Sequence, residues 1–241
     1  MSRNRRPGPS TRVRVHEVTT GQDGAVRRHD DRLATEEPLE IRLAWPGRPA
    51  QRVAVTMRTP GHDFELATGF LYAEGVLASS EDLRTVAYCT DESLAPEQEF
   101  NVVTVELGRL PRKAPAERYA GLSGASSACG VCGTESIDDV LAMCDVRTSS
   151  RWDDLAVPSE VLLALPDRLR EAQRVFDSTG GLHAAGLFDD TGTALVVRED
   201  IGRHNAVDKV VGARVLAGLC TAGFVRDERY VVYSAADRLG V

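Results

Sequence analysis

The sequence has no long uninterrupted hydrophobic run. Its longest candidate, Val210 to Val225, is broken by Gly212, Arg214 and Gly218, so no stretch is long enough to span a bilayer. The basic N-terminal segment, residues 1–9, leads into no hydrophobic region of the kind that a secretory signal needs. These absences predict a cytoplasmic protein without a membrane span, whose thiols are reduced.

An excess of positive charge is also lacking. The chain has 29 Lys and Arg against 36 Asp and Glu, which gives a formal net charge of −7. This balance argues against a general nucleic-acid binder, although local basic clusters could still hold a ligand that bears phosphate. With 241 residues, the chain is long enough to bury a real core as one large or two small domains.

A second cysteine pair is missing as well. Of the five cysteines, only Cys129 and Cys132 have the spacing of metal ligands, and Cys89, Cys144 and Cys220 each stand alone. A structural zinc site needs about four ligands, so the count disfavours zinc. The odd number of cysteines and the lack of a secretory signal disfavour a purely structural disulfide.

What is present is a loop of small residues around that pair, Ser126 to Gly133. Its glycines let a bulky partner reach the sulfur atoms, and a thiolate there needs backbone N–H groups, a helix N-terminus or a nearby Arg or His to stabilise it. A thioredoxin-like motif would open a helix after a strand, whereas residues 120–125 are typical of a flexible loop. We therefore favour a nucleophilic or sulfur-carrying cysteine.

The N-terminal half predicts mainly strands. Alternation predicts a strand over Thr11–His16, then a polar stretch to about Glu37. A hairpin is expected around Pro46 and Gly47, and the β-branched residues predict a strand over Glu99–Leu107. The remaining segments are a hairpin strand pair at 39–43 and 52–57, a helix at 64–75, and a helical pattern at 158–176 that Pro166 is expected to break in two.

Histidines accompany glycines in a second dense cluster. Gly180 and Gly181 precede His183 and a short apolar strand, which places this histidine at the rim of a sheet. A strand over 194–198 leads through a loop into a helix on which His204 and Asp208 share one face, as do Asn205 and Lys209. A solvated helix face would explain these charges, but it does not explain the glycines and histidines at both ends. His62, in a turn before the first helix, is either a functional residue or an ordinary turn residue.

Four stretches together resemble the FdhD family of formate dehydrogenase accessory proteins: residues 57–63, 127–133, 179–186 and 199–209. The resemblance covers about residues 38–212 in the right order. It implies a sulfur carrier that takes persulfide sulfur from a cysteine desulfurase and delivers it to the molybdenum cofactor of formate dehydrogenase. It also implies a cytidine-deaminase-like domain, although the zinc signature of deaminases is absent. Neither nucleic acid nor a membrane is an expected partner, and a homodimer is an open option.

The resemblance also implies which residues act. The persulfide-bearing position falls on Cys129, with Cys132 as its loop partner, and His183 and His204 are candidate substrate-site residues. The cofactor-contacting segment would be Phe224, Val225, Arg226, Asp227, Glu228 and Arg229. Guanidinium groups there suit the phosphates of molybdenum bis(molybdopterin guanine dinucleotide), which would be bound as a substrate, with no permanent metal.

These observations predict an α/β fold with mixed sheets. We expect a tail and first strand over 1–37, partly disordered, an α+β domain over 38–115, and a cytidine-deaminase-like domain over 116–241. Compared with the family pattern, a block of the last domain is missing near 219–222. The alternative function is a non-enzymatic protein that binds the cofactor or formate dehydrogenase, with incidental cysteines; sulfur transfer separates the two hypotheses.

Overall fold

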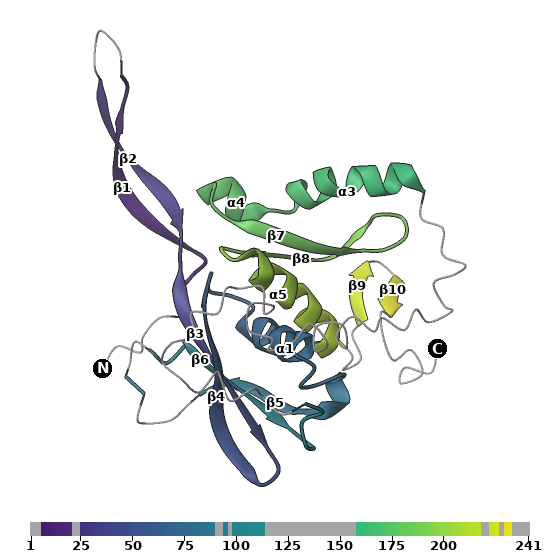
Figure 1. Ribbon diagram of the computed structural model, residues 1–241. Coiled ribbons are helices and arrows are strands. Elements are labelled where there is room, and N and C mark those ends of the chain that lie inside the picture. Colours follow the sequence, from purple (N-terminus) through teal and green to yellow (C-terminus); the bar gives the residue numbers. More distant parts are fainter. Residues whose placement is uncertain are drawn as a thin grey trace, which may run out of the picture.

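The computed structural model describes residues 6–20, 25–89, 94–95, 98–113, 158–217, 222–226 and 229–232 (Figure 1). In chain order the strands are β1 (Ser10–Val18), β2 (Val26–Ala34), β3 (Glu37–Trp45), β4 (Arg48–Arg58), β5 (Leu83–Tyr88), β6 (Val102–Leu107), β7 (His183–Phe188), β8 (Ala194–Asp200), β9 (Ala222–Arg226) and β10 (Arg229–Val232). The helices are α1 (Asp63–Ala73), α3 (Ser159–Glu171), α4 (Arg174–Thr179) and α5 (Arg203–Leu216), with a short 3₁₀ turn, η1, at Ser80–Asp82.

The central sheet has the order β4-β3-β6-β5, in which β3 and β6 are parallel and the other pairs are antiparallel. Leu39, Ile41 and Leu43 alternate along β3 and are fully buried, because successive side chains of a strand point to opposite faces. The predicted hairpin around Pro46 and Gly47 is confirmed as β3–β4. The expected α/β class with mixed sheets is confirmed too.

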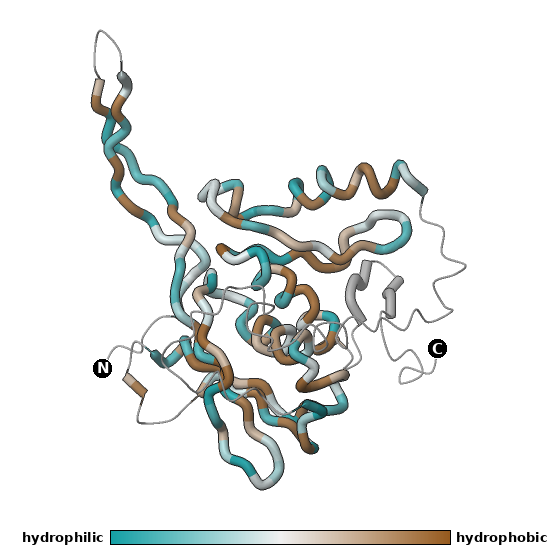
Figure 2. Tube along the Cα trace, in the orientation of Figure 1, coloured by the Kyte–Doolittle hydropathy of each residue, from teal (hydrophilic) through white to brown (hydrophobic). Residues whose placement is uncertain are grey.

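Helix α1 covers the buried face of this sheet. Leu66, Ala67 and Leu71 of α1 join the strand residues in one hydrophobic core, together with Val215 of α5. Figure 2 shows the hydrophobic residues gathered along the strands, α1 and α5, whereas the projecting hairpin is mostly hydrophilic. Helix α1 matches the helix predicted over 64–75, and it is followed by Gly75 with φ +72°. In the central sheet, β5 is the strand for which the sequence analysis made no prediction.

The second half of the described chain adds the β7–β8 hairpin, with α3 and α4 on one side of it and α5 on the other (Figure 1). The expectation that Pro166 breaks the helix in two is wrong, because Pro166 lies inside α3. The helical segment is interrupted later, where α3 ends at Glu171 and α4 begins at Arg174. No residue of α3 is buried, so a carbonyl that loses its helical partner to proline still meets water.

Strands β1 and β2 form a separate antiparallel pair that projects from the body (Figure 1). The strand predicted over Thr11–His16 is confirmed as part of β1. The polar stretch that was expected to follow it contains β2 instead. Its sequence, Val-Arg-Arg-His-Asp-Asp-Arg-Leu-Ala, has no alternating apolar face, because among the described strands it pairs with β1 alone and it buries little.

Candidate functional site

A buried ion pair joins the two segments that sequence reasoning singled out around residues 57–63 and 199–209. Lys209 Nζ lies 2.6 Å from Asp200 Oδ2, and both side chains are almost completely buried. The same ammonium group donates to the backbone oxygens of Thr59 (2.9 Å) and Glu199 (3.2 Å). Asp200 in turn accepts from the backbone N–H of Thr59 (3.1 Å). A buried charge of this kind is tolerated because it is both paired and hydrogen-bonded.

Asn205 closes the same junction from the first turn of α5. Its side-chain amide donates to the Met57 backbone oxygen (2.7 Å) and to Asp200 Oδ1 (3.0 Å). Asp200 Oδ1 also accepts from the backbone N–H of Gly202 (2.9 Å), which fixes the entry into the helix. The interpretation of this stretch as a solvated helix face is therefore wrong for Asn205 and Lys209, which point into the junction.

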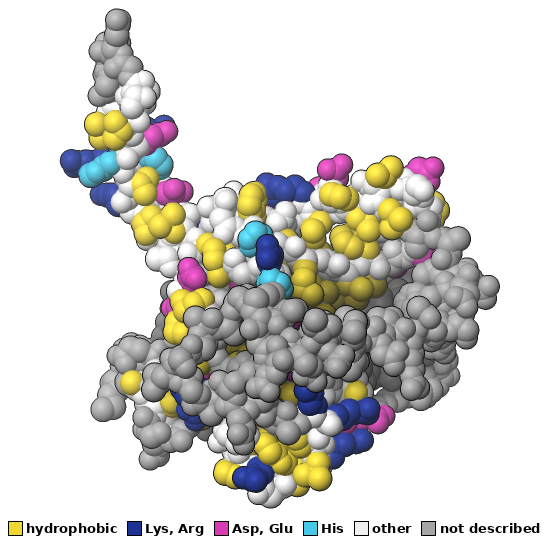
Figure 3. Space-filling view, in the orientation of Figure 1, with side chains coloured by type: hydrophobic (Ala, Val, Ile, Leu, Met, Phe, Trp, Pro, Cys, Tyr) yellow, Lys and Arg dark blue, Asp and Glu magenta, His cyan; other side chains and the backbone are white. Residues whose placement is uncertain are grey.

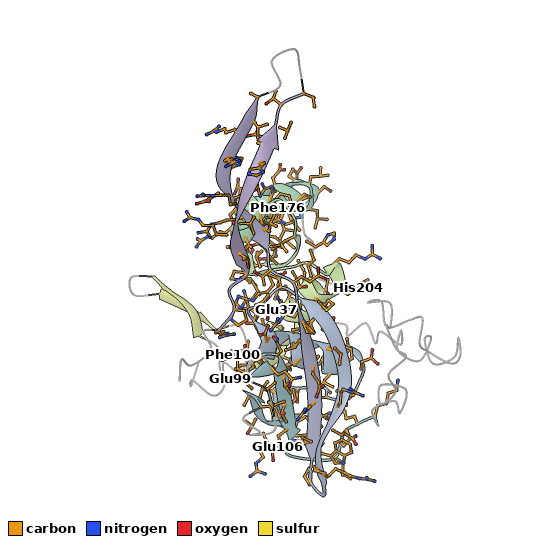
Figure 4. All side chains as sticks on the ribbon, turned by 90° about the vertical axis from the view of Figure 1, so that its left-hand side faces the viewer. Glu37, Glu99, Phe100, Glu106, Phe176 and His204 are labelled. Carbon is orange, nitrogen blue, oxygen red and sulfur yellow. The ribbon has the colours of Figure 1, made fainter. Side chains whose placement is uncertain are left out.

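A second buried pair holds the turn before α1. Arg58 and Asp63 make two hydrogen bonds, Nε to Oδ1 at 3.1 Å and Nη2 to Oδ2 at 3.2 Å. Tyr88 donates its hydroxyl to Asp63 Oδ2 at 2.8 Å, and burial together with this carboxylate raises the pKa of the Tyr88 phenol. Arg58 also reaches the Phe100 backbone oxygen (3.1 Å) and lies 3.6 Å from the Glu37 carboxylate. Figure 4 labels both residues: Glu37 is the first residue of β3 in the central sheet, and Phe100 precedes β6 of the same sheet.

This frame holds His62 in an unusual conformation. His62 is the one non-glycine residue with positive φ (+58°) in the described chain, and its side chain is 53% exposed. Its Nδ1 lies 3.2 Å from Glu65 Oε2, and Arg198 Nη2 donates to Glu65 Oε1 at 2.7 Å. Burial acts to raise the pKa of Glu65, but hydrogen bonds from Arg198 and His62 outweigh it and leave that pKa lowered. A histidine oriented by an ionised carboxylate is suited to proton transfer.

The other predicted histidines lie close to the same junction. His183 opens β7 as the cross-strand partner of Asp200 and is exposed, as predicted for a rim position. His204 is the second residue of α5 and follows the exposed Arg203. Figure 3 shows a Lys or Arg side chain between two histidines near the start of α5, and Figure 4 labels His204. The arrangement places cationic and proton-transferring groups at the surface, next to the buried ion pairs Arg58–Asp63 and Asp200–Lys209.

Of the remaining predicted site residues, some lie outside the described residues and the others lie in the short strands β9 and β10. Cys129, Cys132, Asp227 and Glu228 lie outside the described residues. Phe224, Val225 and Arg226 are in β9 and Arg229 begins β10, where Arg226 and Arg229 are cross-strand partners. In the part of the chain that the structure describes, no three His, Cys, Asp or Glu side chains are grouped so that they could hold a metal ion. The same part contains no helix long and apolar enough to cross a membrane.

The sequence analysis gives no role to Arg58, Thr59 and Asp200, the buried polar residues that position the candidate site. Each lies inside a stretch that was quoted for the resemblance, but composition alone gives no sign that these polar residues are buried. The signal that could have found them is the crowding of glycine with both charge signs in two short stretches, 58–63 and 199–209.

The fold matches a known structure at the level of architecture. A crystal structure described as a putative formate dehydrogenase accessory protein from Desulfotalea psychrophila superposes with a TM-score of 0.54. The two sequences are 20% identical, and the match covers 86% of this chain and 70% of the other. At this identity the likeness establishes the class of fold.

The sequence match is closer and gives the family. Residues 34–219 match the family model for FdhD/NarQ, so the chain belongs to the FdhD/NarQ family. It is 48% identical over 201 residues to a Streptomyces coelicolor protein called sulfur carrier protein FdhD, which covers 79% of this chain and 65% of that protein. A Mycobacterium tuberculosis protein of the same name is 49% identical over 183 residues, or 75% of this chain and 63% of the relative. The chain thus spans slightly less than two thirds of the length of these two relatives.

Proposed function

We propose that the protein carries sulfur as a persulfide on Cys129, from a cysteine desulfurase to the molybdenum cofactor required by formate dehydrogenase. The observation that carries this proposal is the Cys-Gly-Val-Cys stretch within the range that matches the family, 34–219. The names of the relatives, sulfur carrier proteins, and of the structural neighbour, a putative formate dehydrogenase accessory protein, support the same role.

Loading is a thiol–persulfide exchange. The Cys129 thiolate attacks the terminal sulfur of the donor persulfide, a new S–S bond forms as the donor's S–S bond breaks, and the donor cysteine leaves as a thiolate. The rate of such an exchange depends on the thiolate fraction and on access to the sulfur. In delivery, the S–S bond of the Cys129 persulfide would break with its electron pair staying on Cys129, which returns as a thiolate. The terminal sulfur, transferred at the zero oxidation level, would take the two electrons of its new bond from the reduced cofactor, so the carrier is unchanged over the cycle. Cys132 is available as the second thiol of the loop.

The surface around the junction supports such a reaction. His62, His183 and His204 carry imidazole groups, the side chain most often used for proton transfer in proteins, and Arg203 adds a positive charge. The ion pairs Arg58–Asp63 and Asp200–Lys209 fix the backbone beneath them. We propose that this surface receives the anionic cofactor, with Phe224 to Arg229 contacting its guanine nucleotide part.

The test is the intact mass of the protein after incubation with a cysteine desulfurase and cysteine. We expect one added sulfur, mapped by peptide analysis to Cys129 and absent from Cys129→Ser. The matched control is Cys89→Ser, because Cys89 is a half-buried thiol that receives a long hydrogen bond from Arg42 (3.6 Å) on the central sheet. Sulfur that survives Cys129→Ser but is lost from Cys89→Ser would refute the assignment. No added sulfur on any variant would favour a binding protein with incidental cysteines.

A further inference from the structure

His62 occupies a position of the fold that does not favour a histidine. It is the N-cap residue of α1, yet its side chain makes no capping hydrogen bond. Its backbone lies in the left-handed region, with φ +58° and ψ +31°, which costs free energy for a residue that has a Cβ atom. Serine or asparagine at this place would cap the helix, and glycine would relieve the strain. Local structure therefore gives no reason for the imidazole.

Contacts on both sides hold His62 in this conformation. Asp63 Oδ1 accepts from the backbone N–H of Gly61 at 3.2 Å in addition to its bond from Arg58. The backbone oxygen of His62 accepts from the N–H of Leu66 at 2.9 Å, the first bond of the helix. Strained residues that their surroundings hold in place are concentrated at functional sites, so this outlier leads to a hypothesis of function.

The His62 side chain ends a chain of three polar groups. Arg198 donates from Nη1 to the backbone oxygen of Val197 (2.9 Å) and from Nη2 to Glu65 Oε1 (2.7 Å). The second oxygen of that carboxylate, Oε2, lies 3.2 Å from His62 Nδ1. Burial acts to raise the pKa of Glu65, but the bonds from Arg198 and His62 leave it lowered, so the carboxylate is ionised at neutral pH.

This chain sets the tautomer of the imidazole. An ionised carboxylate can only accept hydrogen bonds, so Nδ1 carries the hydrogen that faces Glu65. Nε2 of the neutral ring then has a free lone pair, and it makes no hydrogen bond with any described residue. The side chain is more than half exposed, so a reacting group from outside can reach it. A base oriented by a third group is the arrangement that activates nucleophiles in enzymes.

The other histidines lack this support. His29 lies 3.8 Å from the Glu17 carboxylate, beyond hydrogen-bond distance. Neither His183 nor His204 has an ion pair with a carboxylate of the described residues. Among the histidines that the structure describes, His62 is thus the one whose ring is oriented for proton transfer.

We propose that His62 is the catalytic base and acid of sulfur transfer, with Glu65 and Arg198 as its positioning residues. The assignment rests on the proposed function, which supplies the attacking thiol. That thiol gives its proton to Nε2, and the resulting thiolate attacks the terminal sulfur of the donor persulfide. The donor's S–S bond breaks with its electron pair on the donor cysteine, and His62 returns the proton to that thiolate. The imidazole ends neutral, and the step needs neither an oxidant nor a reductant.

The test measures how fast iodoacetamide alkylates Cys129 in the full-length protein from about pH 6 to 10, by peptide mass analysis. A free thiol titrates near ~8.5 and is only about 3% ionised at pH 7, so a base that ionises it completely speeds alkylation by at most about thirtyfold. We expect His62→Gly to slow alkylation about tenfold at pH 7 and the difference to disappear above about pH 9.5, where the thiol ionises unaided. An unchanged rate at pH 7 would overturn the proposal. So would a rate that is lower by the same factor at every pH, because that indicates lost access to the sulfur.

The choice of variants separates chemistry from folding. Glycine adopts φ +58° without strain, so the melting temperature of His62→Gly should fall by less than about 3 °C. His62→Asn is the second variant, since asparagine also tolerates the left-handed region, and it should give the same pH profile. His16→Asn is the matched control: this exposed histidine of β1 lies outside the candidate site, and its loss should leave the alkylation rate unchanged.

Glu65→Gln tests the positioning role. It removes the charge of the carboxylate and keeps its shape. We expect His62 to lose its preference for the tautomer protonated at Nδ1, which two-bond ¹H–¹⁵N correlation spectra report, and alkylation at pH 7 to slow severalfold. An unchanged tautomer would overturn the role of Glu65 and Arg198.

Sulfur loading from a cysteine desulfurase, measured on the same variants, separates this proposal from the carrier function. Loading of His62→Gly at the wild-type rate would overturn the role of His62 and leave the carrier function intact. A wild-type protein that takes up no sulfur would refute the carrier function, whatever the alkylation profile shows.

Discussion

Gly69 of α1 and Gly212 of α5 bring the two helices into backbone contact. A Cβ atom on Gly69 would lie 1.8 Å from the Asp208 backbone oxygen, and one on Gly212 would lie 1.8 Å from the Glu65 backbone oxygen. The two glycines thus set the distance between α1, which follows His62, and α5, which begins at Arg203. The geometry of the candidate site depends on this crossing.

Gly212→Ala should therefore destabilise the protein strongly. The added methyl group overlaps backbone atoms that have no freedom to rotate away, so the helices must separate and lose packing at a cost of about 3 kcal/mol. Gly108→Ala is the control, because its nearest neighbour, the Asp82 oxygen, is 4.0 Å from the added Cβ. Urea denaturation measures both. Equal midpoints for the two variants would contradict the close crossing.

Lys209→Met tests the buried junction. Removing the ammonium group leaves the Asp200 carboxylate buried without its counter-ion, which typically costs 3–5 kcal/mol, so we expect a loss of about that size. Adding Asp200→Asn to this variant should recover part of the loss, since the uncompensated charge disappears. Arg84→Met breaks the exposed pair with Glu106 (2.9 Å) and should change the free energy of unfolding by less than about 1 kcal/mol. A loss from Lys209→Met no larger than this control would argue against a structural role for the pair.

The raised pKa of Asp208 leads us to expect an unusual dependence of the free energy of unfolding on pH. Burial, followed by the charges of Glu74 and Asp200, raises the pKa of the Asp208 carboxyl to about 7 from an ordinary 3.8. Between about pH 4 and 7 the folded protein then holds a proton that the unfolded chain has released, so this group's contribution falls as the pH rises and is lowest above pH 7.

Asp208→Asn should remove the loss of stability that the ionisation of Asp208 causes as the pH rises. The variant should be more stable than wild type at pH 8, by up to about 4 kcal/mol for a shift of this size, and the advantage should shrink towards pH 4. Urea denaturation at a series of pH values measures the difference. A difference that stays constant from pH 4 to 8 would show that Asp208 does not titrate in this window.

Much of the scaffold could be predicted because its elements carry local signals. The β3–β4 hairpin has alternating apolar residues and a Pro-Gly turn, and α1 has helical spacing with a glycine after it. Strand β2 has no such pattern, because it pairs with no described strand except β1 and buries little, and Pro166 fits in α3 because that helix is exposed. The site was found only in part. His183 and His204 stand out beside glycines, whereas the burial of Lys209 and Asn205 depends on contacts about 150 residues away in sequence.

The proposed nucleotide segment gives the last prediction. If Phe224 to Arg229 contacts the guanine nucleotide part of the cofactor, Arg226→Ala should weaken binding of GDP, because losing one charge-assisted hydrogen bond costs roughly 1.5–3 kcal/mol, or about ten- to a hundredfold in affinity. Arg229, its cross-strand partner, provides a second variant with the same change of charge. Cys129→Ala should leave GDP affinity nearly unchanged, since the sulfur has to reach only the molybdenum end of the cofactor. Calorimetric titration of the wild type comes first, because undetectable GDP binding would withdraw the assignment of Phe224 to Arg229. If GDP affinity is unchanged in both arginine variants, the nucleotide must bind at another surface. Arg203 and His204, at the start of α5, would then be the next residues to substitute.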